Sequence, residues 1–253
     1  MLAVSPSTNA STSAETHLLS MKVVDTADGS STAFSDTYGE TFHSVNGAVT
    51  ESRHVFLDAT GVSARLQRGQ TTRVLEIGLG LGLNALLTAD LALGNAARLE
   101  YHALENDRRV CTWMQGMNYQ QWLNEPSLAA ALVNGLASSL KTGPSGGTDG
   151  GSAISLAQNI ELTVHWVDAT TADLPDLLFH AIYLDAFSPD ANPACWTCEF
   201  FTTLYEKLAT GGNLATYSAK GSVRRALLAA GFSVNKLAGP PGKREMLLAR
   251  KQE

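Results

Sequence analysis

Glycines at close spacing mark the part of the sequence that is best suited to bind a cofactor. The segment reads Glu76-Ile-Gly78-Leu-Gly80-Leu-Gly82-Leu-Asn84 and follows an apolar run. Glycine permits a tight turn and lets a ligand approach the backbone closely. A dinucleotide loop has the spacing Gly-x-Gly-x-x-Gly, whereas the third glycine here falls one residue early. The loop therefore favours S-adenosylmethionine, whose carboxylate can lie near the amides that begin the next helix, over NAD or FAD.

Two acidic residues follow this loop at the ends of later apolar runs. Glu105 comes after the run at 99–104, where its carboxylate can accept hydrogen bonds from both ribose hydroxyls. Asp168 ends the next run and is a candidate to receive the adenine amino group. Either acid could instead cap a following helix, but capping does not account for three signals at three successive strand ends. The predicted cofactor-binding residues are Glu76, Gly78, Leu79, Gly80, Gly82, Asn84, Glu105 and Asp168.

The stretch Tyr183-Leu-Asp185-Ala-Phe187-Ser-Pro189 is the candidate site of group transfer. It brings an acid, an aromatic ring and a proline-stiffened loop to the end of a further apolar run. We predict that Asp185 is the catalytic residue. Its first role is to orient an amine nucleophile and its second is to accept the proton, because an ordinary carboxylate is a weak base.

Alternation of apolar runs with helical segments predicts an α/β fold. Strands are predicted at 73–77, 99–104, 160–167, 179–184 and 213–218, and helices at 83–93, 108–117, 127–140, 197–209 and 222–230. Such alternation is typical of a parallel sheet, at whose carboxyl edge ligands bind. The last strands, 232–237 and 245–250, are joined by a short connection and must be antiparallel. We predict the Rossmann-like class I methyltransferase layout, a mostly parallel seven-stranded sheet with a C-terminal antiparallel hairpin.

Three segments lie outside this alternation. Residues 1–20 are rich in Ser, Thr and Ala and are predicted to be a disordered tail. Residues 21–70 are predicted to form an N-terminal extension, with a small β-hairpin around Asp28-Gly29 and a short helix over 50–60. The methyltransferase domain is expected over 71–253. Within it, residues 141–153 hold five glycines and are expected to be a flexible insertion.

Charge is distributed unevenly along the chain. The net charge of −6 argues against a protein that binds nucleic acid over its whole surface. Residues 213–253 nonetheless hold eight Lys and Arg against two Glu, a local charge of +6. This segment is a candidate to bind a phosphate backbone. The alternative is that its basic residues form an ordinary solvent-exposed surface. The candidate phosphate contacts are Lys220, Arg224, Arg225, Lys243 and Arg244.

The cysteines and the apolar segments narrow the class of protein. Cys195-Trp-Thr-Cys198 has the spacing of a zinc or redox pair, but a structural zinc site needs four ligands and the sequence offers no second pair. We therefore expect free thiols and no metal. No run approaches the roughly 18 apolar residues of a membrane span, and the first 20 residues lack a secretory pattern. We expect a cytoplasmic protein with no membrane partner.

The combined motifs resemble those of the tRNA 5-methylaminomethyl-2-thiouridine methyltransferases, the methyltransferase half of the bifunctional MnmC proteins. The resemblance covers about residues 22–250. The matching segments are the glycine loop, Asp185-x-Phe-x-Pro-x-x-Asn-Pro-x-x-Trp196, Thr216-Tyr-Ser-Ala-Lys-Gly-x-Val-Arg-Arg225, Gly242-Lys-Arg-Glu-Met246, Gly39-Glu-Thr-Phe-His-Ser44 and Glu51-Ser-Arg-His-Val-Phe56.

This resemblance implies that S-adenosylmethionine donates a methyl group to the aminomethyl group of a wobble uridine in the tRNA anticodon region. Tyr38, His43 and Phe187 are then candidates to contact the exposed base, with core packing as the alternative for Phe187. The bifunctional relatives continue into a flavin-dependent oxidase domain beyond the point where this chain stops. We therefore expect a stand-alone methyltransferase with no fused oxidase. The insertion at 141–153 departs from the family pattern.

Other functions stay open at this point. An aminopropyltransferase of the spermidine synthase kind shares the fold, the glycine loop and a strand-end Asp that acts on an amine. Such an enzyme normally carries further acids, and only Asp190 follows Asp185 closely. A methyltransferase for another small amine is a second alternative. A non-catalytic binding module is a third, against which the intact cofactor loop and the strand-end acids argue.

Overall fold

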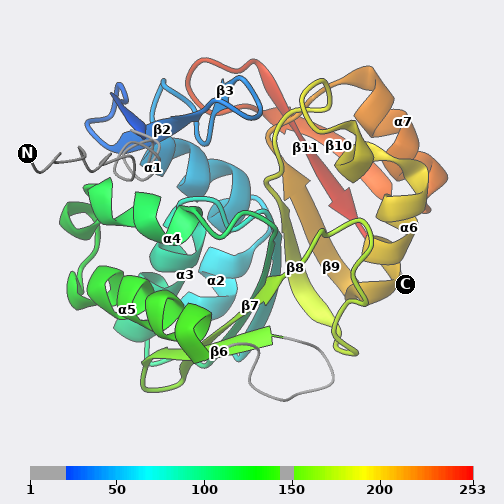
Figure 1. The fold of residues 1–253 in the computed structure, drawn as a ribbon. Coiled ribbons are helices and arrows are strands. Elements are labelled where there is room, and N and C mark those ends of the chain that lie inside the picture. The colour runs from blue at the N-terminus through cyan, green and yellow to red at the C-terminus, as the bar shows by residue number, and fades with distance from the viewer. Residues whose placement is uncertain (1–20, 143–150, 253) are drawn as a thin grey trace, which may run out of the picture.

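Within residues 21–142 and 151–252, the part of the chain that this computed structural model describes, five parallel strands form the centre of the fold (Figure 1). They are β4 (Thr72–Ile77), β5 (Leu99–Glu105), β7 (Ile160–Trp166), β8 (Phe179–Leu184) and β9 (Leu208–Thr216). Antiparallel strands extend both edges, namely β11 (Glu245–Arg250) with β10 (Ser233–Ala238) and, opposite, β6 (Gly151–Ala157). The order across the sheet is β10-β11-β9-β8-β4-β5-β7-β6.

The parallel centre and the C-terminal hairpin confirm the predicted class of fold, but the predicted number of strands is wrong. The described sheet has eight strands, because β6 adds to the edge beside β7. Residues 151–153, predicted to be part of a flexible insertion, belong to this strand. Ile154 and Leu156 are buried in the core, whereas Ser155 between them is exposed, and this alternation is the period of a strand. Positions 143–150 of the predicted insertion and the predicted tail at 1–20 lie outside the described residues.

Helices on one face of the sheet bury the side chains of alternate strand positions, such as Val74 and Tyr101. These helices are α1 (Ala48–Glu51), the π-helix η1 (Ser52–Asp58), α2 (Val62–Gln67), α3 (Leu83–Gly94) and α5 (Ser127–Thr142). Phe56 of η1 is buried, with its ring centroid 5.3 Å from that of Tyr183 on β8. The second half of the predicted N-terminal extension is therefore part of the main core.

The opposite face is covered by α6 (Cys198–Lys207) and α7 (Gly221–Ala229) (Figure 1). They bury the other strand positions, including Leu75 and Ile77, against Phe201 and Leu227. The helix predicted over 197–209 ends at Lys207, because the chain enters β9 at Leu208. The helix predicted over 108–117 is divided into α4 (Val110–Trp113) and the 3-10 turn η2 (Met114–Gly116), followed by η3 (Tyr119–Trp122).

The predicted N-terminal hairpin is present and gains a third strand. β1 (Lys22–Asp25), β2 (Ser31–Ser35) and β3 (Glu40–Thr41) form a small antiparallel sheet above the carboxyl ends of the parallel strands (Figure 1). Asp28 ties its turn to α1, since one carboxylate oxygen accepts from the Thr50 backbone N–H at 2.9 Å. Burial raises the pKa of the Asp28 carboxyl, but hydrogen bonds from Ser30, Thr50 and Thr26 outweigh burial and hold this pKa far below its usual value. The small sheet is thus fixed over the edge where ligands bind in this fold.

The contact between α5 and β6 gives a test of the packing. A Cβ atom at Gly135 would overlap the Ile154 side chain, whereas one at Gly94, the last residue of α3, would meet nothing within 4 Å. Gly135→Ala should lower the free energy of unfolding by about 1–3 kcal/mol through overpacking. Gly94→Ala is the matched control and should be neutral or stabilising. Equal free energies for the two variants in urea denaturation would contradict this packing.

Candidate active site

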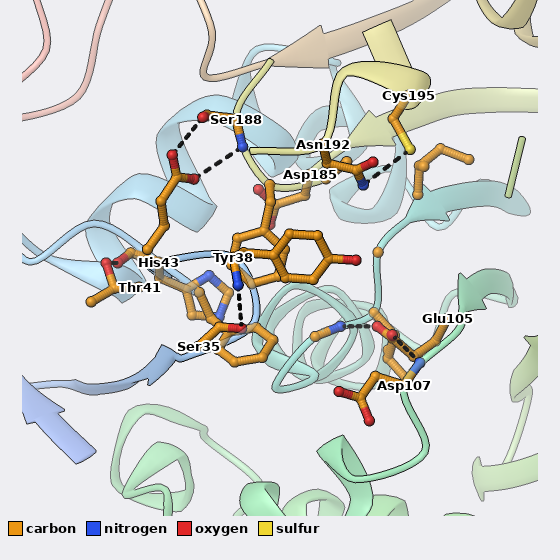
Figure 2. Close-up of a pocket in the computed structure, with 18 of the residues that line it drawn as sticks. Ser35, Tyr38, Thr41, His43, Glu105, Asp107, Asp185, Ser188, Asn192 and Cys195 are labelled. Atoms are coloured by element: carbon orange, nitrogen blue, oxygen red, sulfur yellow. Dashed lines mark hydrogen bonds between the residues drawn. The ribbon is translucent and has the colours of Figure 1, made fainter. Parts of the chain in front are cut away.

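A cavity of about 630 Å³ lies at the carboxyl edge of the sheet, between the strand-end loops and the N-terminal strands (Figure 2). This volume is typical of a small-molecule site. Ten of the predicted site residues line it: Tyr38, His43, Gly78, Leu79, Gly80, Glu105, Asp168, Asp185, Phe187 and Lys243. The remaining predicted residues do not: Glu76, Gly82, Asn84, Lys220, Arg224, Arg225 and Arg244.

The glycine loop after β4 needs glycine for both of the reasons expected. Gly78, Gly80 and Gly82 have φ angles of 89°, 52° and 76°, in the left-handed region that other residues rarely adopt. A Cβ at Gly78 would lie 3.2 Å from the Asp185 carbonyl oxygen, and one at Gly80 would lie 3.1 Å from the Phe42 ring. Side chains on this loop would therefore fill the narrow space between it and the opposite wall.

Acids at the ends of β5 and β7 stand where a nucleoside could be held. Glu105 is buried, and its carboxylate accepts hydrogen bonds from the backbone N–H groups of Gly80 at 2.9 Å and Asp107 at 2.8 Å. Burial raises the pKa of this carboxyl. Each oxygen keeps a further lone pair for a ligand hydroxyl. Asp168 is exposed and accepts from the Thr170 backbone N–H at 2.9 Å, which is the turn-capping role considered as its alternative.

Asn84 connects a buried acid to a half-buried one. Its side-chain amide donates to Asp185 Oδ2 and to Glu76 Oε1, both at 2.8 Å. Glu76 is fully buried, and burial raises its pKa to about 8. Glu76 and Asn84 therefore support Asp185 from behind the cavity wall. The sequence predicted that these two residues contact the cofactor directly, but neither of them lines the cavity.

Asp185 follows β8 and faces the cavity (Figure 2). Burial raises its pKa well above the usual value, and electrostatic repulsion from the Glu76 and Glu51 carboxylates adds to this effect. The Asn84 amide and the Lys243 ammonium oppose this effect. A carboxylate with a raised pKa accepts a proton more readily than an ordinary Asp. The weak basicity assumed for Asp185 from the sequence is therefore corrected in the direction of a stronger base.

Aromatic rings join the N-terminal strands to the loop after β8. Tyr38 stacks on Phe187 with ring centroids 4.1 Å apart, and Phe42 meets Phe187 edge-on at 5.1 Å. Glu40 reinforces this link by accepting hydrogen bonds from the Ser188 backbone N–H at 3.1 Å and hydroxyl at 2.5 Å (Figure 2). Phe187 lines the cavity, which favours a place in the cavity wall over the alternative of core packing.

The far end of the cavity holds a group of residues that the sequence analysis only partly found. Lys243, predicted to contact phosphate, instead lies in the cavity wall with its ammonium 2.7 Å from Glu51 Oε1. Glu51 itself was missed as a site residue, although it stands in a segment that matched the family pattern. His43 is buried beside them, and its pKa is lowered to about 4 by that burial, so the ring is neutral.

The other predicted phosphate contacts lie outside the cavity. Lys220 forms an ion pair with Asp190, while Arg225 and Arg244 are exposed and Arg224 is half-buried. Their contact with RNA stays a prediction. In the described part of the chain, no group of three or more His, Cys, Asp or Glu residues is arranged to hold a metal. None of the helices there is both long and apolar enough to cross a membrane. Cys195 is a free thiol on the cavity wall.

Comparison with known proteins points to one group of enzymes. Residues 139–252 match a family model described as S-adenosyl-L-methionine-dependent methyltransferase. The tRNA 5-methylaminomethyl-2-thiouridine biosynthesis bifunctional protein MnmC of Aromatoleum aromaticum is 34% identical over 233 residues, covering 90% of this chain and 35% of that protein. The protein of the same name from Paraburkholderia xenovorans is 30% identical over 224 residues, covering 87% and 33%. The crystal structure of MNMC2 from Aquifex aeolicus has a TM-score of 0.68 at 27% identity, covering 90% of this chain and 70% of that one.

The glycine loop and strand-end acids on this sheet, together with the family model, define an S-adenosyl-L-methionine-dependent methyltransferase. Within that class, the chain belongs to the family formed by the methyltransferase half of MnmC. It spans about a third of the length of the curated relatives that it matches. The aminopropyltransferase alternative gains no support from these comparisons.

The raised pKa of Asp185 predicts a pH-dependent stability. The folded state binds this proton more tightly than the unfolded state, so Asp185 lowers stability as pH rises from its ordinary pKa near 3.8 through the raised value. Asp185→Asn should therefore raise the free energy of unfolding at neutral pH by about 1 kcal/mol. That gain corresponds to a Tm increase of about 2–4 °C.

Thermal unfolding of both proteins from pH 5 to pH 8 measures this effect. The difference in Tm should grow as pH rises. Asp36→Asn, at an exposed position near the same wall, is the control and should follow the wild type at every pH. A constant or shrinking difference for Asp185→Asn would show that the buried carboxylate carries no such cost.

Proposed function

We propose that this chain is an N-methyltransferase that converts the 5-aminomethyl group on a tRNA wobble uridine into 5-methylaminomethyl. The observation that carries the proposal is the position of Asp185 between the glycine-loop side and the N-terminal side of one cavity. The names of the relatives, which refer to 5-methylaminomethyl-2-thiouridine biosynthesis in tRNA, support this substrate. A cytoplasmic location and contact with the anticodon region belong to the same proposal.

The residues around the glycine loop fit S-adenosylmethionine. The left-handed glycines leave room against Phe42 and the Asp185 carbonyl that any side chain would fill. Glu105 has acceptor capacity for ribose hydroxyls, and Asp168 lies on the wall after the next strand. When bound, this cofactor supplies an electrophilic methyl group, and S-adenosylhomocysteine leaves as the carbon–sulfur bond breaks.

The nucleophile must be an uncharged amine, which is the chemical difficulty of this reaction. An alkylammonium has a pKa near 10.4, so only about one molecule in 10³ is neutral at pH 7 in water. A closed cavity disfavours the charged form of the amine, and the raised pKa of Asp185 favours proton uptake by the carboxylate. Both shifts bring the two pKa values together, so that proton transfer from the ammonium to Asp185 becomes less costly.

Asp185 has two roles in this scheme. Its carboxylate accepts a hydrogen bond from an amine N–H and so directs the nitrogen lone pair. It also takes the one proton that the ammonium must lose before the nitrogen attacks, and the methylated nitrogen then keeps its two remaining protons as an ammonium. The Asn84 amide holds the carboxylate in place at 2.8 Å, and the stacked rings of Tyr38 and Phe187 exclude water from one side. Positioning of this kind typically contributes several orders of magnitude in rate.

Substitution of Asp185 tests this role. Asp185→Ala should keep S-adenosylmethionine affinity and lose at least about two orders of magnitude in turnover, the usual contribution of a general base. The assay is transfer of labelled methyl groups to tRNA from cells that lack the gene, followed by nucleoside mass analysis. Asp36→Ala, at an exposed position, is the control. Near-normal turnover by Asp185→Ala would assign catalysis to another group, and failure of the wild type to label tRNA would refute the substrate.

Basic residues outside the cavity give a second test. Arg224 and Arg225 of α7 are proposed to contact RNA phosphates, which position the substrate without reading its bases. Arg224→Ala/Arg225→Ala should weaken tRNA binding and flatten the plot of log affinity against log salt by about 0.7–0.9 for each phosphate that is no longer neutralised. Arg68→Ala, at an exposed position at the end of α2, is the control for the removal of one positive charge. An unchanged slope would remove Arg224 and Arg225 from the interface.

A further inference from the structure

An ion pair lies in the wall of the cavity at its N-terminal side. Glu51 is 5% exposed, and its Oε1 is 2.7 Å from the Lys243 ammonium, while its Oε2 accepts from the Ser44 backbone N–H at 2.9 Å. The same ammonium lies 4.0 Å from the centroid of the Tyr217 ring. Tyr217 is held in turn by a 2.8 Å hydrogen bond to the Ala186 carbonyl. Both charges are therefore fixed in position.

Such a pair is poorly explained by stability alone. Desolvation of two charges often cancels their attraction, and an apolar pair of the same size is frequently as stable. Glu51 and Lys243 also line the cavity, where a ligand can reach them. Each retains hydrogen-bonding capacity. The carboxylate has further lone pairs, and the ammonium has N–H groups beyond the one directed at Glu51.

His43 adds an unused polar group to the same wall. Its backbone is fixed, since the N–H donates to Thr32 Oγ1 at 3.0 Å and the carbonyl accepts from Thr41 Oγ1 at 2.8 Å. The residue is 7% exposed, and the Nε2 atom of its ring has no hydrogen-bond partner. A buried nitrogen without a partner costs free energy that a ligand would recover. The neutral ring can carry its proton on Nε2 and donate it.

These groups together offer a donor, an acceptor and a donor: the Lys243 ammonium, the Glu51 carboxylate and His43 Nε2–H. We propose that Glu51, Lys243 and His43 form the subsite that recognises the imide edge of a uracil ring. N3–H donates to Glu51, O4 accepts from Lys243, and the atom at position 2 accepts from His43. This inference deepens the proposed function and rests on it.

The arrangement also directs the substituent that reacts. C5 of uracil is bonded to C4, so a ring held through O4 by Lys243 presents its 5-aminomethyl group on the same side. The charges of Glu51 and Lys243 both affect the pKa of Asp185, so the ion pair and this carboxylate lie close enough to interact electrostatically. The contact between O4 and Lys243 therefore both recognises the base and orients the amine.

A cytosine ring would oppose each of the two main contacts. Its N4 amino group would direct a donor at the Lys243 ammonium, and its unprotonated N3 would direct a lone pair at Glu51. Sites whose buried polar groups are left unpaired by the wrong substrate discriminate strongly. The subsite therefore predicts a preference for uridine that is built into the cavity, independent of any contact with the rest of the tRNA.

The test uses two anticodon stem-loop RNAs that are identical except that one carries 5-aminomethyluridine and the other 5-aminomethylcytidine. The wild type should favour the uridine by at least about 100-fold in kcat/KM. Glu51→Gln offers an amide that both donates and accepts, so this ratio should fall at least about tenfold. Lys243→Met should lower kcat/KM on the uridine by about tenfold or more.

Matched controls come from a second ion pair in the same hairpin. Lys236 and Glu245 are 2.7 Å apart on the surface of β10 and β11, with side chains 48% and 33% exposed. Lys236→Met and Glu245→Gln carry the same changes of chemistry and should leave the ratio unchanged. Calorimetric S-adenosylmethionine binding and thermal unfolding of all four variants identify any that fail to fold.

The outcomes separate the inference from the function on which it rests. Equal use of both RNAs by the wild type would overturn the subsite and needs no variant that folds. A strong wild-type preference that Glu51→Gln retains would overturn it as well, because the reading group would then lie elsewhere. Binding of S-adenosylmethionine without methylation of either RNA would instead refute the proposed substrate, and the inference with it.

Discussion

The hydrogen bonds of the Asn84 side chain to Asp185 and Glu76 are the interaction on which the site depends. Two carboxyl groups this close in a buried region cannot both be ionised without a large electrostatic cost. Burial raises the pKa of both carboxyl groups, and Asp185 is the one of the two that lines the cavity. Because Asn84 lies on α3 and the two acids lie on β4 and after β8, the same bonds also fix the glycine loop relative to the Asp185 carboxylate.

The two sides of the cavity come from different parts of the chain. The parallel strands and their loops supply the glycines, Glu105 and Asp185. The N-terminal segment supplies the opposite wall, including Tyr38, His43 and Glu51. In the proposed function, the strand side holds the cofactor and the N-terminal segment contacts the substrate.

Several features of this cavity oppose the stability of the protein. Asp185 is held where its charged form is disfavoured, His43 has a buried nitrogen without a partner, and Glu51 and Lys243 are partly desolvated. Each would be replaced by an apolar side chain if packing alone were selected. All four residues line the same cavity, in line with the general tendency of functional sites to contain polar groups with perturbed pKa values.

The sequence by itself determined the alternation of strands and helices, the glycine loop, and the strand-end positions of Glu105 and Asp185. These features are local, because side-chain period and glycine conformation are properties of neighbouring residues. Only the tertiary structure decided that Glu76 and Asn84 stand behind the wall, and that Lys243 meets Glu51, 192 positions away in the chain, instead of facing solvent. β6 followed the same rule, since its short run becomes a strand only by pairing with β7. Such contacts depend on which distant side chains the fold brings together, and no local pattern records that.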